Sequence, residues 1–100
     1  MTRINMESIN FIDKKISIIF DQLWFQEDIN TLRQQILNKI KDHQVIEIIQ
    51  GADRESCRFT WLDTEFNLHF DYYSQSCWFN THDEITSSKI QSLFDLLAQN

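Results

Sequence analysis

Glycine and proline are almost absent from this sequence of 100 residues, which has one glycine and no proline. Their scarcity excludes collagen-like chains, glycine-rich linkers and proline-rich disordered segments. Long apolar runs are also absent, because the longest extend over three residues, as in 18–20, whereas a membrane-spanning helix needs about 20. The first twenty residues include Glu7 and Asp13 and lack the apolar stretch of a secretory signal. We therefore expect one domain over 1–100 that is neither exported nor inserted in a membrane.

Cysteine is also rare, with only Cys57 and Cys77 present. Small secreted domains often have four or more cysteines, so we expect two reduced thiols and a cytoplasmic location. No pair of cysteines or histidines has the spacing of a zinc motif, and a glycine-rich phosphate loop is absent. We expect no metal, no cofactor and no catalytic residues, which favours a protein that is not an enzyme.

Acidic residues outnumber basic ones by 15 to 9, for a net charge of −6. Most of the excess lies in residues 51–100, which contain three basic and eight acidic side chains, a difference of −5. Nucleic acids and anionic membranes are bound mainly by lysine and arginine, so neither is an expected partner. The acidic surface either keeps the protein soluble or attracts a basic partner.

The spacing of the apolar residues predicts an α+β fold. Alternation with a period of two predicts strands, and an apolar stripe at helical spacing predicts the first helix. In chain order we expect a strand, a helix, four strands and a helix: 15–20, 28–42, 44–50, 56–62, 65–72, 75–80 and 84–98. This order, β-α-β-β-β-β-α, predicts a two-layer sandwich with a mainly antiparallel sheet and both helices on one face. Residues 1–13 form either an N-terminal arm or an extra strand.

Short hairpin loops predict which side chains share the polar face of the sheet. Two-residue loops at 63–64 and 73–74 would place Arg58 opposite His69, and His69 opposite Trp78. The neighbouring positions of the same face would hold three further polar side chains, and these complete the candidate binding set: Asn67, Asp71 and Asn80.

Trp78 is the one bulky aromatic residue predicted on this polar face. Tryptophan and arginine are enriched where protein interfaces concentrate their binding energy. We therefore predict a protein-protein interaction module that uses the open sheet face around Trp78. Two alternatives remain: residues 4–12 cover Trp78, or the domain is a small enzyme or ligand binder that uses Arg58, His69 and Asp71.

Two segments of the chain resemble a small family of gammaproteobacterial proteins of unknown function. They are Gly51-Ala52-Asp53-Arg54, together with Val45-Ile46-Glu47 before it, and Ser74-Gln75-Ser76-Cys77-Trp78. The family's members have about the length of this chain. The resemblance implies a bacterial cytoplasmic protein and transfers no catalytic or binding residue.

Overall fold

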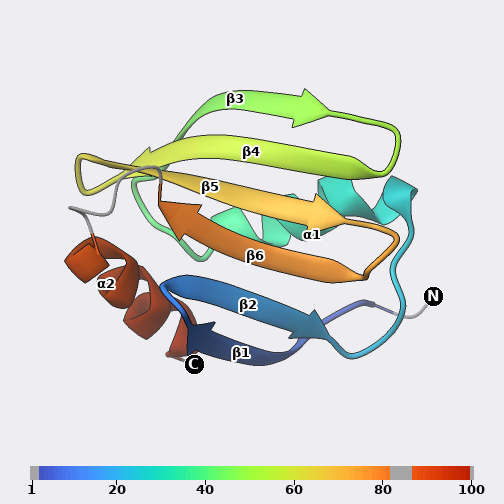
Figure 1. Ribbon diagram of the computed structural model, residues 1–100, viewed down its shortest axis with the longest axis horizontal. Helices are drawn as coiled ribbons and strands as arrows, with labels where there is room; N and C mark the ends of the chain where they lie inside the picture. Colours follow the sequence, from blue (N-terminus) through green and yellow to red (C-terminus); the bar gives the residue numbers. More distant parts are fainter. Residues whose placement is uncertain (1–2, 82–86, 100) are drawn as a thin grey trace.

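A computed structural model describes residues 3–81 and 87–99 and shows a sheet with two α-helices (Figure 1). The chain first forms a β-hairpin, then a short 3₁₀ turn and a helix, then four consecutive strands and a second helix. The elements are β1 (Met6–Ile12), β2 (Lys15–Phe20), η1 (Gln26–Asp28), α1 (Ile29–Leu37), β3 (Gln44–Gln50), β4 (Arg54–Trp61), β5 (Thr64–Asp71), β6 (Ser76–Thr81) and α2 (Ser87–Ala98).

Within the described residues the strands form one six-stranded sheet in the order β1-β2-β6-β5-β4-β3. Every neighbouring pair is antiparallel, and the pairing of β2 with β6 joins the N-terminal hairpin to the other four strands. The α+β class and the antiparallel sheet are confirmed. Residues 6–12 form the edge strand β1, which is the extra strand given as one alternative for residues 1–13 and which the predicted order of elements did not include. Because β1 pairs with β2 at the edge of the sheet, residues 6–12 do not lie over the face around Trp78.

Buried and more exposed side chains alternate along β2, β4, β5 and β6, so the buried ones form the core on one face of the sheet. Its strand members are Ile16, Ile18, Phe20, Cys57, Phe59, Phe66, Leu68, Phe70, Cys77 and Phe79. The buried side chains of α1 and α2 belong to the same cluster. Figure 1 shows α1 behind the strands, so the viewer faces the other side of the sheet.

The first helix is shorter than the predicted 28–42. It begins at Ile29, because the Asp28 carboxylate accepts a hydrogen bond of 2.8 Å from the Phe25 N–H and closes a 3₁₀ turn before it. It ends at Leu37, and Asp42 soon adopts a positive φ of 67° that no α-helix accommodates. The N-terminal part of the predicted second helix, 84–86, lies outside the described residues.

The predicted register of the β4–β5 hairpin is wrong by two residues. Its loop is Leu62-Asp63, both with positive φ angles of 52° and 58°, which is the backbone of a type I′ turn. Arg58 consequently faces Asn67, and Ser56 takes the place beside His69. A shift of two residues keeps every side chain on its predicted face. The predicted β5–β6 register is confirmed, with His69 opposite Trp78.

The two cysteines are free thiols, and both are buried on the core face, as predicted. Burial raises the pKa of the Cys57 thiol to about 11, and burial likewise raises the pKa of Cys77 well above its ordinary value. Because the thiolate is the reactive form, we expect slow labelling by a thiol reagent in the native protein and fast labelling in denaturant. Rapid labelling of either thiol under native conditions would contradict this assignment of the strand faces.

Candidate functional site

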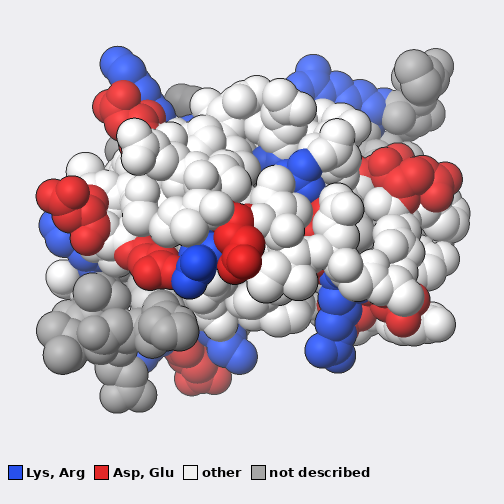
Figure 2. Space-filling view, turned by 90° about the horizontal axis from the view of Figure 1, so that it is seen from above, with Lys and Arg blue, Asp and Glu red and all other residues white. Residues whose placement is uncertain are grey.

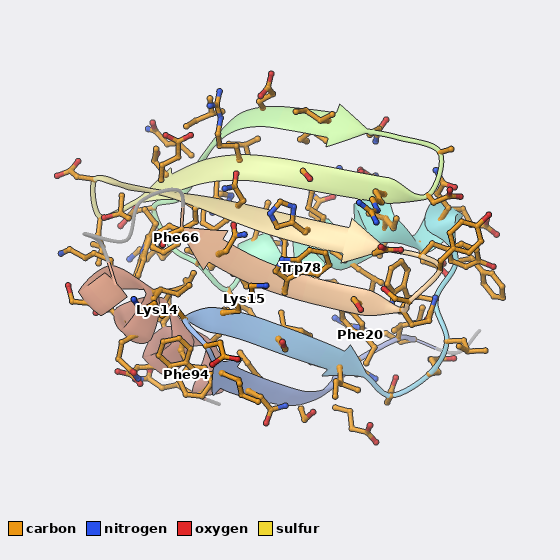
Figure 3. The ribbon with its side chains drawn as sticks, viewed as in Figure 1. Lys14, Lys15, Phe20, Phe66, Trp78 and Phe94 are labelled. Atoms are coloured by element: carbon orange, nitrogen blue, oxygen red, sulfur yellow. The ribbon has the colours of Figure 1, made fainter. Side chains whose placement is uncertain are left out.

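The open face of the sheet carries a stacked pair of aromatic rings at its centre. His69 on β5 and Trp78 on β6 are cross-strand partners, and their ring centroids lie 5.0 Å apart at an angle of 28°. Both side chains are partly exposed. Figure 3 shows Trp78 and Lys15 lying in front of the strands, on the side away from α1.

Hydrogen bonds hold the imidazole of His69 in place on both sides. The Ser56 hydroxyl lies 2.8 Å from Nδ1 of His69, and Oδ1 of Asn80 lies 3.3 Å from Nε2. The Asn67 amide donates to the same Asn80 oxygen over 3.3 Å. Since that oxygen accepts, Nε2 carries the proton and Nδ1 accepts the hydroxyl of Ser56. The four side chains form one polar network, which contacts Trp78 through the ring of His69.

The pKa of His69 is lowered from its ordinary value, mainly because the ring is partly withdrawn from water. The hydrogen bond that His69 donates to Asn80 raises the pKa again, and the positive charge of Lys15 lowers it. The lowered pKa keeps the ring neutral at neutral pH, which agrees with its role as donor to Asn80 and acceptor from Ser56.

Ser56 and His69 have the contact expected of a nucleophile and its base. Acyl transfer also needs free donors for the developing oxyanion. The backbone of β4 around Ser56 is instead paired on one side with β3 and on the other with β5. The arrangement is thus better suited to binding a partner than to this reaction.

The structure brings Trp78, His69, Asn67 and Asn80 together as predicted, but it engages the two charged candidates elsewhere.

Arg58 forms ion pairs with Glu65 at 3.1 Å and Glu47 at 3.5 Å. Asp71 pairs with Arg54 at 3.2 Å and accepts a hydrogen bond of 3.1 Å from the Tyr73 N–H in the following turn. Both charges are thus engaged in ion pairs with other side chains rather than with His69.

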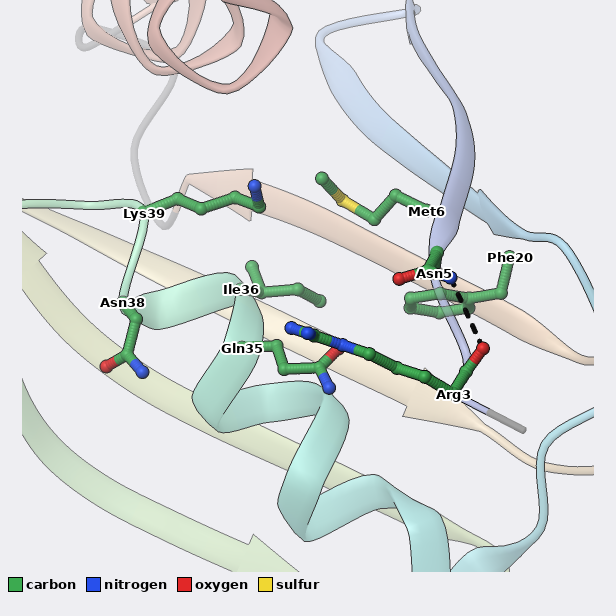
Figure 4. A pocket seen from close by; sticks show the side chains of 8 residues that line it. All are labelled: Arg3, Asn5, Met6, Phe20, Gln35, Ile36, Asn38 and Lys39. Atoms are coloured by element: carbon green, nitrogen blue, oxygen red, sulfur yellow. Dashed lines mark hydrogen bonds between the residues drawn. The ribbon is translucent and has the colours of Figure 1, made fainter. Parts of the chain in front are cut away.

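A groove lies between α1 and the N-terminal segment (Figure 4). It has a volume of about 460 Å³, and Phe20 and Ile36 form part of its apolar lining. Arg3 and Lys39 extend their charged ends into it from opposite sides. Two cations in a groove with a mixed polar and apolar lining are chemically suited to a small organic anion.

Sequence reasoning missed an exposed apolar patch around the buried Trp24. Leu23, Phe25 and Tyr73 are 70%, 50% and 77% exposed, while Trp24 is only 1% exposed. The Gln75 side chain fixes the Trp24 backbone by accepting from its N–H at 3.0 Å and donating to its carbonyl at 2.8 Å. The run Leu-Trp-Phe could have indicated this arrangement, since an extended backbone turns its middle residue inward and its neighbours outward.

Among residues 3–81 and 87–99, no group of three or more His, Cys, Asp or Glu side chains is placed to hold a metal ion. No helix in this described part of the chain is both long and apolar enough to cross a membrane.

Comparison with known proteins gives one match. A family model described as a protein of unknown function (DUF3630) matches residues 6–99, which agrees with the resemblance to a family of unknown function. No curated protein and no solved structure matches the chain.

Proposed function

The chain belongs to DUF3630, a family of proteins of unknown function, and we propose that it is a protein-protein interaction module that binds through the open sheet face around Trp78. The observation that carries this proposal is the stacked pair of His69 and Trp78, partly exposed in the middle of that face. An aromatic anchor held rigid by its neighbours loses little conformational entropy on binding, so it can contribute much of an interface's energy.

Small polar side chains frame the anchor and suit it to a flat partner surface. Ser17 lies opposite Trp78 on β2, and Ser56 lies opposite His69 on β4. Serine and asparagine side chains can donate or accept at the rim of an interface, with or without bridging water. The partner is therefore expected to present an apolar or aromatic residue surrounded by hydrogen-bonding groups.

The charges on the open face are largely balanced. Arg58 is paired with Glu47 and Glu65, and Arg54 with Asp71. A nearly neutral face favours a protein partner with little net charge at the contact. Binding through this face should change little with salt, whereas a basic partner of the acidic second half should be released by salt.

The proposal is tested by affinity capture from the source cell with the wild-type protein, Trp78→Ala and a control variant, Leu62→Ala. Leu62 is 52% exposed and lies in the β4–β5 turn, so the control also removes an exposed apolar side chain but leaves the open face intact. We expect Trp78→Ala to lose the partner and Leu62→Ala to keep it, at both low and high salt. Equal recovery by all three proteins would contradict the proposal.

Binding of a small organic anion is a second candidate function, favoured by the groove with Arg3 and Lys39. It replaces the predicted ligand site of Arg58, His69 and Asp71, whose two charged members are paired elsewhere. It ranks second because the groove is open at a surface where both cations are exposed. We also propose a bacterial cytoplasmic location, which the two unpaired thiols support.

A further inference from the structure

Strand β3 (Gln44–Gln50) is an edge strand with no neighbour on its outer side among the described residues. All seven of its residues are exposed. Four of them are β-branched and apolar, namely Val45, Ile46, Ile48 and Ile49, and they are 44%, 48%, 41% and 60% exposed. Scattered exposed apolar side chains are ordinary. Four on one edge strand, whose outer side has no partner among the described residues, make that edge unusually apolar.

Proteins usually protect such an edge with lysine, proline, a local charge or a β-bulge. Strand β3 has neither lysine nor proline, and its one charged residue, Glu47, is paired with Arg58. Figure 2 looks onto this side of the molecule and shows a broad uncharged surface beside a small group of acidic and basic side chains. A bulge between Val45 and Glu47 disturbs the start of the strand, and the segment from Glu47 to Gln50 pairs regularly with β4.

The two sides of β3 follow from its pairing with β4. Ile48 lies opposite Cys57 and therefore projects on the core side, whereas Ile49 lies opposite Ser56 and projects on the open face. Both sides of the edge are thus apolar. A partner strand added here would cover apolar side chains above and below the sheet while satisfying the outward backbone groups.

We propose that β3 pairs in antiparallel fashion with β3 of a second copy of this chain, so that the two sheets become one continuous sheet. Two identical edges related by a two-fold axis form a self-complementary contact, which is the commonest way to build a dimer. The charges favour this occupant, because the edge is nearly neutral within a chain of net charge −6. Away from this edge and from the similarly balanced open face, the excess of acidic side chains makes two copies repel each other.

The side of the sheet to which each β3 side chain projects limits the register in which two copies of β3 can pair. Opposed residues must project to the same side of the joint sheet, which permits axes at Glu47, Ile48 or Ile49. An axis at Glu47 sets two carboxylates opposite each other and runs into the bulge, and an axis at Ile49 shortens the overlap. An axis at Ile48 places Ile48 against its copy, and Glu47 against Ile49 of the second copy.

The contact is small, so the dimer is expected to be weak and concentration-dependent. Because the two copies carry the same net charge, added salt should strengthen it by screening their repulsion. Sedimentation velocity at rising protein concentration measures both effects. We expect Ile48→Lys to abolish the dimer, because it buries a charge at the axis, and Ile19→Lys to leave it unchanged. Ile19 is 50% exposed and lies on β2, away from this edge.

Disulfide formation tests directly whether Ile48 of one copy lies opposite Ile48 of the other. Residues opposed across an antiparallel pair have Cβ atoms about 4.5–5.5 Å apart, close enough for a disulfide after a small adjustment. Ile48→Cys should therefore form a disulfide-linked dimer under mild oxidation, and Ile19→Cys should not. The native Cys57 and Cys77 are buried and do not compete.

A wild-type protein that stays monomeric at every concentration would overturn the proposal, as would equal linking of Ile19→Cys. Loss of the dimer in Trp78→Ala would also overturn it, because that residue lies on the open face and not at the edge. This last arm separates the edge contact from the proposed function of the Trp78 face, since either can fail without the other.

Discussion

Replacing Phe70 with alanine is expected to lower the free energy of unfolding by about 3–5 kcal/mol. The ring is 1% exposed and makes an edge contact with Trp24, with ring centroids 5.7 Å apart. Its loss removes buried apolar surface and leaves a cavity that the neighbouring β-strands, held by their ladders, cannot close. The loss is a large share of the stability of a domain of this size. Urea unfolding followed by circular dichroism measures the change.

Trp78→Ala is the matched comparison. It removes an even larger ring from β6, one residue after the position opposite Phe70, and this ring lies on the other face of the sheet. We expect it to cost much less than Phe70→Ala, because the indole is partly exposed and stacks on the ring of His69, which is also partly exposed. Equal destabilisation by the two variants would show that Trp78 contributes to the core. The proposed interaction surface would then be wrong.

The alternation of apolar side chains was enough to predict the faces of the sheet. Phe66, Leu68 and Phe70 repeat with a period of two and are all buried. The register was harder to predict, because it depends on which two residues occupy the turn. Leu62 and Asp63 adopt positive φ angles without the Asn-Gly sequence that usually indicates them. For that reason Ser56 was missed as the partner of His69.

The exposure of the edge strand β3 could not be predicted from its sequence pattern either. Residues 44–50 have the β-branched composition of a buried strand, yet all seven are exposed. Their exposure follows from the strand order of the sheet, in which β3 lies at the edge beyond β4. The candidate site was predicted in part for the same reason: faces follow from local alternation, whereas neighbours follow from topology.

Glu55 shows how a charged residue can be misjudged from sequence. Counted with the acidic surface of residues 51–100, it is in fact 4% exposed and pairs with Arg33 of α1. The periodicity contained the signal, because Glu55 precedes Cys57 and Phe59 on the core-facing positions of β4. A carboxylate at such a position requires a partner of opposite charge in the element that covers it.

Breaking this pair is expected to have the second large effect on stability. Among the described residues, Arg33→Met leaves the buried carboxylate of Glu55 with the Gln50 amide alone, which donates to it over 3.1 Å. Removing one partner of a buried ion pair typically costs about 3–5 kcal/mol, because the remaining charge stays desolvated. We expect a loss of that size for Arg33→Met in urea unfolding at neutral pH.

Two further variants decide whether the buried charge is the cause. The double variant Arg33→Met/Glu55→Met removes both charges, so it should regain most of the lost stability. Arg54→Met breaks the pair with Asp71, in which the arginine side chain is 78% exposed, and exposed pairs contribute at most about 1 kcal/mol. If Arg33→Met costs no more than Arg54→Met, Glu55 reaches water or another donor once Arg33 is gone. If instead the double variant is as unstable as Arg33→Met, the loss comes from packing of the arginine side chain on the sheet rather than from an uncompensated carboxylate.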